Sequence, residues 1–337
     1  MPNNSMKMIF MLTLISGIMM VMSSNSWFGA WMGLEINLLS FIPLMINSNN
    51  IYTTEATMKY FLIQALASSL LLFIILLNYS FESPLNQLIE MKILITMPLF
   101  LKSGVAPFHW WFPSVMEGLD WLNCLILMTL QKFAPLSLLF MLLENTNQLT
   151  FTIIASVIIG SIGGMNQLSL RKLLTYSSIN HIGWSVAALM VSKNMWLFYM
   201  VTYSLMTMTI ILIIKPMNLS FVNQIYFIGN SWTIKFLLLS SFLSLGGLPP
   251  FFGFLPKWLV IQYMINNNMI LIISIMIMFS LITLFYYLRI FYSTSMLLHH
   301  ECSWNINKFT LPPNKLSTLL FSMLTGMLYS PMLIFIF

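Results

Sequence analysis

The sequence predicts an all-α polytopic membrane protein. Three observations support this fold class: 59% of the 337 residues are hydrophobic, only 7% are charged, and apolar stretches recur along the whole chain. A soluble globular domain carries about 25% charged residues, so this chain lacks the charge needed to solvate a surface. The hydrocarbon of a lipid bilayer is therefore the expected environment.

A bilayer core about 30 Å thick requires roughly 20 apolar residues per helix, and this length predicts about eleven transmembrane helices. They cover approximately residues 6–24, 26–46, 56–78, 92–112, 121–143, 149–165, 172–191, 195–214, 234–264, 269–292 and 315–336. The connections are short and rich in asparagine, as is typical of turns. No small-residue cleavage site follows the first span, so we expect no cleaved signal peptide.

Two of these spans contain matching interruptions. The fourth and the ninth both read G-x-x-P-F-x-x-x-x-P, beginning at Gly104 and at Gly247. Proline inside a helix removes a backbone hydrogen bond and clashes with the preceding turn. We expect helix breaks at Gly104, Pro107, Gly247, Pro249 and Pro250.

The two interrupted spans lie five helices apart, so they cross the membrane in opposite directions. Such a pair of broken helices is typical of inverted repeats, in which the breaks lie beside the transport path. We expect a first five-helix repeat over residues 1–145, a second over 146–293, and a loop with a final helix over 294–337. All three belong to a single membrane domain.

Basic residues are unequally divided between the two sides of this topology. The amino-terminal side holds or flanks Lys7, Lys59, Arg171, Lys172, Lys215, Lys235, Arg289, Lys308 and Lys315, whereas the other side has Lys92 and Lys193. The positive-inside rule predicts that the amino terminus faces the positive-inside compartment and the carboxyl terminus the opposite side. The basic residues form no continuous stripe, which argues against nucleic-acid binding.

Four charged residues lie inside expected helices: Glu35, Lys102, Lys132 and Lys257. Each charge at a helix centre costs roughly 2.5–3.5 kcal/mol on insertion scales. A proton relay would justify this cost, with Glu35 and Lys102 as a switchable pair, Lys132 as the next carrier and Lys257 as the exit-side partner. The alternatives are a fixed Glu35–Lys102 ion pair that locks two helices, and a Lys257 that snorkels to an interface.

Two histidines are further relay candidates. His181 lies in the middle of the seventh span, roughly where Glu35 lies in the other repeat. It is expected either to exchange protons or to form a hydrogen bond between helices. His109 follows the first break, where it would line the same path or bond the carbonyls that the break frees.

Other charged residues have structural interpretations. Glu55 and Lys59 are spaced for an i,i+4 pair at the start of the third span. Ser114-x-x-Glu117 reads as a capping box, and Asp120 is expected to cap the fifth span. None of these residues requires a functional explanation.

Cofactor and metal sites are not predicted. The adjacent residues His299-His300-Glu301-Cys302 do not easily converge on one tetrahedral ion, so a solvated loop is expected there. The two cysteines cannot build a disulfide framework. The sequence has no P-loop, dinucleotide fingerprint or nucleophile elbow, and too few intramembrane histidines for paired haem ligation. We expect this chain to carry out no redox chemistry by itself.

Four segments, 24–44, 101–119, 166–184 and 243–262, closely resemble the antiporter-like membrane subunits of respiratory complex I. The resemblance runs the length of the chain and weakens around 79–91, 215–233 and after 293. It implies the antiporter-like proton-channel fold, with the family's key glutamate and lysines at Glu35, Lys102, Lys132 and Lys257. The activity implied is H⁺-translocating NADH:ubiquinone reduction by a hetero-oligomeric complex.

The same resemblance implies partners and a location. The implied partners are subunits 4L and 4, neighbouring supernumerary subunits and lipids, while FMN, iron–sulfur clusters and ubiquinone are expected in other subunits. The implied location is the mitochondrial inner membrane, with the amino terminus in the matrix and the carboxyl terminus in the intermembrane space. The alternatives are a free-standing cation/proton antiporter and a structural subunit that pumps nothing.

Overall fold

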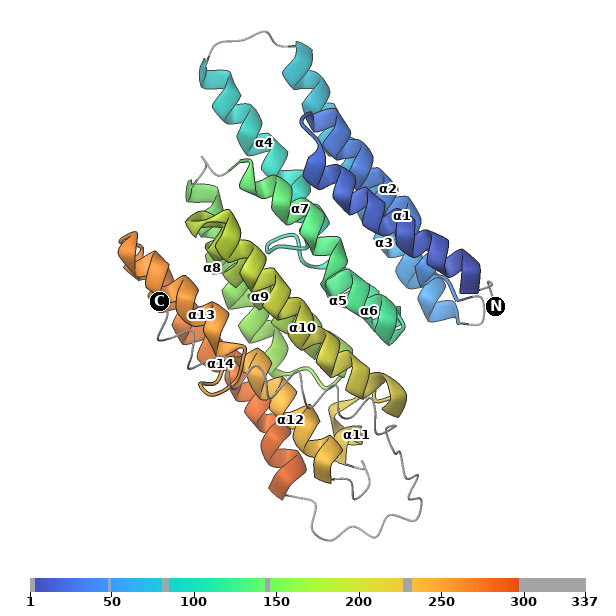
Figure 1. Cartoon of the computed structure of the whole chain (residues 1–337), viewed down its shortest axis with the longest axis vertical. Coiled ribbons are helices and arrows are strands. Elements are labelled where there is room, and N and C mark those ends of the chain that lie inside the picture. The colour runs from blue at the N-terminus through green and yellow to red at the C-terminus, as the bar shows by residue number, and fades with distance from the viewer. Residues whose placement is uncertain (1–3, 48–49, 81–84, 143–145, 227–231, 297–337) are drawn as a thin grey trace. The chain divides into compact units, whose positions relative to one another are not determined.

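A computed structural model describes residues 4–47, 50–80, 85–142, 146–226 and 232–296 (Figure 1). Within these ranges the chain forms α-helices joined by turns, with one isolated bridge between Ser169 and Phe221. The expected last helix at 315–336 and the segment His299–Cys302 lie outside the described residues, as do Lys308 and Lys315. Every expected span from 6–24 to 269–292 coincides with one helix or with two consecutive helices.

The chain divides into two compact units, Met1–Ser156 and Val157–Phe337. The boundary falls inside α8, about ten residues beyond the 145/146 division that the sequence suggests. The first unit contains α1 (Asn4–Ser23), α2 (Trp27–Met45), α3 (Ile51–Ser80), α4 (Leu85–Ser103), α5 (Trp111–Gly118), α6 (Trp121–Met128), α7 (Leu130–Phe140) and the first half of α8 (Thr146–Met165).

Small residues bring α1 and α2 together, side by side in Figure 1. A Cβ atom at Gly33 would lie 2.7 Å from Cγ2 of Val21, and one at Gly17 would lie 3.1 Å from the backbone nitrogen of Asn37. Membrane helices pack by such close backbone approach because lipid provides no hydrophobic force between them. This contact fixes the rotation of α2 and therefore the directions of Glu35 and Asn37.

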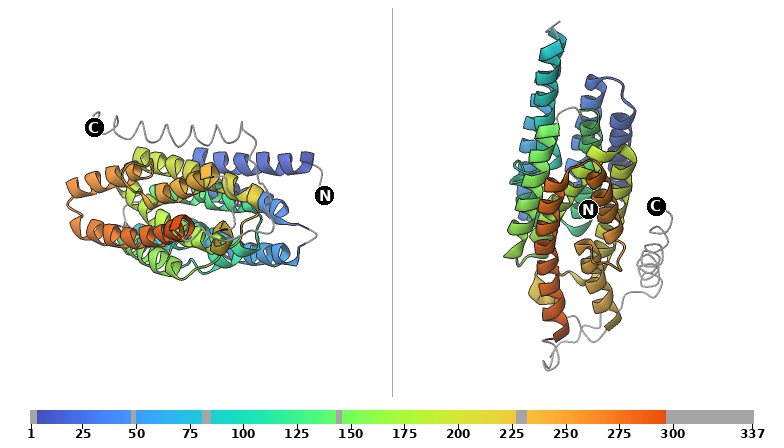
Figure 2. Two further views of the ribbon diagram at one scale, coloured as in Figure 1. Left: turned by 90° about the horizontal axis from the view of Figure 1, so that it is seen from below. Right: turned by 90° about the vertical axis from the view of Figure 1, so that its left-hand side faces the viewer.

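The second unit contains the rest of α8, α9 (Leu170–Val191), α10 (Lys193–Met217), α11 (Val222–Tyr226), α12 (Trp232–Gly246), α13 (Phe254–Asn266) and α14 (Ile270–Met296). Within each unit the long helices run nearly parallel to one another (Figure 2). The short helix α11 was not expected from the sequence. The bridge between Ser169 and Phe221 joins the start of α9 to the segment after α10.

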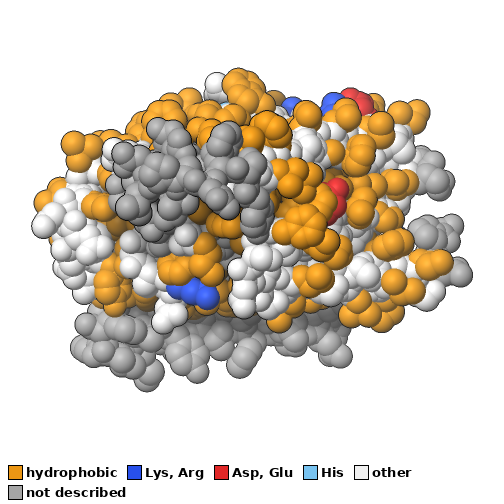
Figure 3. All heavy atoms as spheres, turned by 90° about the horizontal axis from the view of Figure 1, so that it is seen from above, with side chains coloured by type: hydrophobic (Ala, Val, Ile, Leu, Met, Phe, Trp, Pro, Cys, Tyr) orange, Lys and Arg blue, Asp and Glu red, His pale blue; other side chains and the backbone are white. Residues whose placement is uncertain are grey.

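Among the described residues, seven helices are long and apolar enough to cross a membrane. They are Ser5–Ser23, Trp27–Met45, Ile51–Asn78, Trp121–Phe140, Asn147–Met165, Lys193–Met217 and Ile270–Tyr292. Large hydrophobic side chains are exposed along them, such as Met8, Leu12 and Met19 on α1. Hydrophobic side chains predominate on the face shown in Figure 3. A surface of this kind suits lipid or an apolar partner.

One local prediction is wrong and another needs refinement. The fifth span is interrupted at Thr129 (φ −113°, ψ −79°), where α6 ends at Met128 and α7 begins at Leu130, although the two helices together still cover a membrane-spanning stretch, Trp121–Phe140. The capping box at Ser114 does not form because α5 begins earlier, at Trp111, and the Ser114 hydroxyl bonds the Trp111 carbonyl inside that helix.

Two other local predictions hold to different degrees. Glu55 and Lys59 form the expected ion pair at 2.5 Å. Asp120 stands at the N-cap position of α6, but its carboxylate makes no capping bond. It accepts a hydrogen bond from Asn47 instead.

Candidate functional site

The first break in the chain separates α4 from α5. Gly104 has φ +71°, a left-handed conformation that strains any residue with a Cβ atom, so glycine fits this position. The carbonyls at the end of α4 find new donors: the Trp111 indole bonds Leu101 O at 3.1 Å, and the Gln64 amide bonds Lys102 O at 3.3 Å. Uncharged side chains therefore provide the hydrogen-bond donors for the last carbonyls of α4.

Lys102 is the second-last residue of α4, and its side chain is buried. The Glu35 carboxylate on α2 interacts with it electrostatically. No ion pair joins the two, and the buried Oε2 of Glu35 has no hydrogen-bond partner among the described residues. The structure therefore contradicts the alternative of a fixed ion pair that locks α2 to α4.

A cavity of about 10 Å³ lies beside Lys102 and is lined by Leu34, Asn37, Leu38, Tyr60, Gln64, Lys102, Gln131 and Pro135. These residues come from α2, α3, α4 and α7 of the first unit. The Tyr60 hydroxyl donates to Gln131 Oε1 at 3.3 Å, and Gln131 Nε2 donates to Asn37 Oδ1 at 2.9 Å. A chain of uncharged polar groups thus crosses from α3 through α7 to α2 at this cavity.

Lys132 follows the break between α6 and α7 and is almost fully buried. Its ammonium nitrogen lies 4.8 Å from the centre of the Phe112 ring on α5. A cation over an aromatic face is attracted by the ring quadrupole, more strongly where water is excluded. Phe112 therefore provides one contact that favours the charged form of Lys132.

The second break separates α12 from α13 and has the same backbone feature, a glycine with positive φ, Gly247 at +79°. Here a lysine provides the hydrogen-bond donor for the last carbonyls of α12. Lys257 Nζ donates to the carbonyl of Gly246 at 2.9 Å and lies 3.5 Å from that of Leu245. It also lies 5.7 Å from the Trp184 ring. Lys257 is buried, which argues against the alternative that it snorkels to an interface.

The two histidines both have local partners. His181 on α9 is buried, and its Nδ1 lies 2.8 Å from the Tyr199 hydroxyl on α10. The ring of Tyr203 packs against it at 5.0 Å. His109 is buried in the first break, where its Nδ1 lies 3.2 Å from the Pro107 carbonyl. These contacts tie α9 to α10 and bond one carbonyl of the break.

Comparison with known proteins identifies the family. The model of the NADH:quinone oxidoreductase/Mrp antiporter transmembrane family matches residues 24–283. NADH-ubiquinone oxidoreductase chain 2 of Anopheles gambiae is 50% identical over 317 residues, which cover 92% of each chain. The same protein of Locusta migratoria is 46% identical over 308 residues, or 90% of each chain. The chain belongs to the NADH-ubiquinone oxidoreductase chain 2 family.

Solved structures of other proteins share the fold of this NADH-ubiquinone oxidoreductase chain 2 family protein. A chain of respiratory complex I from Thermus thermophilus with bound Aureothin superimposes with a TM-score of 0.84 at 22% identity, over 97% of this chain and 78% of that one. A chain of the Mrp complex from Dietzia sp. DQ12-45-1b gives 0.78 at 16% identity, over 87% and 61% respectively. At such identities the likeness shows the antiporter-like fold alone.

The uncharged polar residues that line the cavity were not predicted from the sequence. The cost of burying a charge pointed to Lys102, but it does not point to Asn37, Tyr60, Gln64 and Gln131. Their sequence signal is an amide or phenol inside an apolar span, which also requires a hydrogen-bond partner in lipid.

The sequence also contains a signal for the break between α6 and α7. Pro135 lacks an N–H and leaves the Gln131 carbonyl without its usual helical donor.

No group of three or more His, Cys, Asp or Glu side chains that could hold a metal ion occurs in the described part of this chain 2 family member. Its buried polar side chains include lysine amines, imidazoles, amides, phenols and hydroxyls, and the partly exposed Glu35 adds a carboxylate. Of these groups, the amines, the imidazoles and the carboxylate are the ones that readily exchange protons.

Proposed function

We propose that this chain is a membrane-arm subunit of the proton-pumping NADH:ubiquinone oxidoreductase and carries protons through Glu35, Lys102, Lys132 and Lys257. Its membership in the chain 2 family over most of its length supports the assignment to this complex. Its apolar spanning helices and its relatives in animals support a multi-pass location in the mitochondrial inner membrane. The chain acts as part of a hetero-oligomeric respiratory complex.

The observation that carries the relay is the relationship between Glu35 and Lys102. Two opposite charges inside apolar helices interact electrostatically without a direct ion pair. A locked pair would hold its proton, whereas a separated pair responds when either charge changes. This arrangement favours a switch over a structural brace.

The proposed mechanism uses the protonation of one group to set that of the next. Burial disfavours a charged lysine, and a nearby carboxylate favours it. When Glu35 loses its proton, Lys102 is favoured as an ammonium, and when Glu35 is neutral, Lys102 releases its proton. Lys132 is the next carrier and Lys257 the exit-side partner. His181 and His109 are further candidates, since imidazole is the side chain best suited to titrate near neutral pH.

We further infer that the two halves of the chain are inverted five-helix repeats, over residues 1–145 and 146–293. Equal spacing of equivalent features supports this. The two positive-φ glycines, Gly104 and Gly247, are 143 positions apart (247 − 104), and so are the starts of α5 and α13, Trp111 and Phe254. The same interval relates Gly17 to Gly160, Asn37 to Asn180, Tyr60 to Tyr203 and Pro113 to Pro256.

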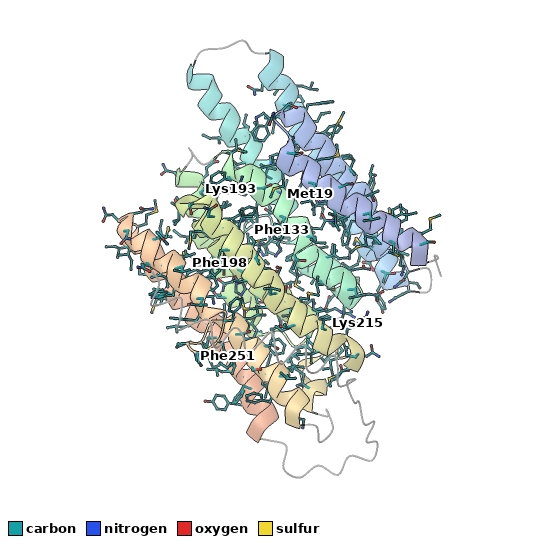
Figure 4. All side chains as sticks on the ribbon, viewed as in Figure 1. Met19, Phe133, Lys193, Phe198, Lys215 and Phe251 are labelled. Atoms are coloured by element: carbon teal, nitrogen blue, oxygen red, sulfur yellow. The ribbon has the colours of Figure 1, made fainter. Side chains whose placement is uncertain are left out.

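The orientation with the amino terminus in the matrix is part of this proposal. Basic residues gather at one end of the second unit. Arg171 stands at the start of α9, the bridge after Lys215 joins that start to the end of α10, and Arg289 on α14 bonds the Gln167 carbonyl at 3.2 Å. Lys193 lies at the opposite end of α10 from Lys215 (Figure 4). The positive-inside rule assigns the richer end to the matrix.

Partner subunits are proposed to cover the face of α2 that carries Glu35. Glu35 is partly exposed within this chain although its Oε2 atom is buried, and the neighbouring Met32 and Phe28 are exposed. A carboxylate facing lipid is costly, so a protein partner is the favoured cover. We propose subunits 4L and 4 as membrane-arm neighbours, with supernumerary subunits and lipid on the remaining apolar surface.

The experiment replaces the proposed carriers in the assembled complex. Glu35→Ala and Lys132→Ala are expected to assemble normally, judged by co-migration on a native gel, but to lower NADH oxidation coupled to proton pumping severalfold. Glu55→Ala, which removes an exposed carboxylate, is the matched control and should leave pumping unchanged. Normal pumping in both Glu35→Ala and Lys132→Ala would leave a structural subunit, and a chain found outside the respiratory complex would favour a free-standing antiporter.

A further inference from the structure

The cavity beside Lys102 has the size and lining of a site for one water molecule. Its volume is about 10 Å³, close to the roughly 10–15 Å³ that one water needs on this measure. A buried water also needs two to four polar partners. Asn37, Tyr60, Gln64, Lys102 and Gln131 all line the space, so both conditions are met.

The Lys102 ammonium needs such a partner. It has three N–H donors, and none of them bonds another residue in the part of the chain that the structure describes, where the Gln64 side chain bonds the backbone carbonyl of Lys102 and not its ammonium. A buried charge without hydrogen bonds is strongly disfavoured. Lys257, by contrast, has two carbonyls within reach. One water in the cavity would supply the missing acceptor.

The hydrogen-bonded chain of Tyr60, Gln131 and Asn37 leaves donors and an acceptor that a water in the cavity can bond. Gln131 bonds Tyr60 through its oxygen and Asn37 through its nitrogen, so its amide orientation is fixed from both sides. The second hydrogen of the Gln131 amide, the Asn37 amide nitrogen and the Tyr60 oxygen remain available. Gln131 is the central member because it connects α7 to both α2 and α3.

We propose that this cavity is an ordered-water site and that Gln131 is a positioning residue, which holds the water against the Lys102 ammonium. The inference rests on the proposed function and adds to it a group outside the charged relay. Gln131 carries no proton itself. It keeps solvent beside Lys102 where the apolar helices would otherwise exclude it, so that the charged form of Lys102 remains accessible during each cycle.

The test compares two substitutions that separate polarity from volume. Gln131→Met keeps the length of the side chain and removes its hydrogen bonds, whereas Gln131→Asn shortens the side chain and keeps an amide. We expect Gln131→Met to lower the pumping rate of the assembled complex by about tenfold, the loss that corresponds to one hydrogen bond to a charged group. Gln131→Asn should retain more of the rate. A role in packing alone predicts the reverse order, and that result would overturn the proposal.

A matched control lies on α8. Gln148 accepts a hydrogen bond of 2.9 Å from Thr96 on α4 and does not line the cavity, so Gln148→Met should pump at the normal rate. A map of the intact complex that resolves waters should show one within hydrogen-bonding distance of both Lys102 Nζ and Gln131, and this water should be lost in Gln131→Met. Absence of that water from the unmodified complex would also overturn the proposal.

Two further variants keep the test decisive. If Gln131→Met does not assemble, Tyr60→Phe removes only the hydroxyl that donates to Gln131 and should lower the rate severalfold, while an unchanged rate there contradicts the inference. Lys102→Met separates this inference from the proposed function. Normal pumping in Lys102→Met would refute the relay, whereas slow pumping in Lys102→Met with normal pumping in the Gln131 and Tyr60 variants would refute the water site alone.

Discussion

Lys257 donates a hydrogen bond of 2.9 Å to the Gly246 carbonyl and so closes the broken end of α12 from the far side of the break. A cation at the carboxyl end of a helix is favoured by the helix dipole. At the matching break in the first unit, the indole of Trp111 and the amide of Gln64 bond the last carbonyls of α4. Lys102 is therefore not engaged in closing its own helix end, whereas Lys257 is.

This difference predicts two separable effects at Lys257. Lys257→Met should lower the temperature at which the complex loses activity, because two buried carbonyls lose their donor at a cost of about 1–3 kcal/mol. Lys257→Arg can still donate but cannot release its proton. It should therefore retain thermal stability and lose pumping. If Lys257→Arg pumps normally, Lys257 serves only to close the helix end.

The left-handed glycine of the second break predicts a local stability effect. Gly247→Ala places a Cβ atom at φ +79° and 2.9 Å from Lys257 Cδ, so we expect destabilisation by about 1–2 kcal/mol. Gly246→Ala is the neighbouring control, since its Cβ would meet nothing closer than 3.5 Å. Thermal inactivation of the two variants provides the comparison. Equal inactivation temperatures would show that the turn relaxes without strain.

The contact between His181 and Tyr199 allows two roles for His181, proton transfer or a structural link between α9 and α10, and one substitution separates them. His181→Gln keeps a side chain that can bond the Tyr199 hydroxyl but cannot titrate. We expect this variant to assemble normally and to pump severalfold more slowly, measured as acidification coupled to NADH oxidation. Full pumping by His181→Gln would restrict His181 to joining α9 and α10.

The exposed ion pair of Glu55 and Lys59 predicts almost no effect. Their side chains are 58% and 46% exposed within the chain, and exposed pairs of this i,i+4 type contribute only about 0.3–0.5 kcal/mol. Lys59→Gln should leave both the inactivation temperature and the pumping rate unchanged within error. A large loss of pumping would show that this pair lies on the proton path.

Prediction from sequence succeeded where the signal was the cost of placing a group in lipid. The length of the apolar stretches located the helices, and the lysines inside them, Lys102, Lys132 and Lys257, are indeed buried. The relay role of these lysines and of Glu35 stays a prediction. It failed where the outcome depended on which neighbour approaches. The proximity of Lys257 to the end of α12 depends on the path of the turn between Gly247 and Phe254, and no spacing rule describes that path.

The sequence by itself determined that this chain is a bundle of membrane helices, that two of them are interrupted, and which charges lie inside. These properties follow from hydrophobicity, proline chemistry and insertion cost, which are local to each segment. The tertiary structure alone decided that Lys257 closes a helix end and that Asn37, Tyr60 and Gln131 join around Lys102. Hydrogen bonds between helices depend on rotation and depth, and these are set by packing such as that between Gly17 and Gly33. Among the buried lysines, it is this packing that distinguishes one anchored at a helix end, Lys257, from one that is not, Lys102.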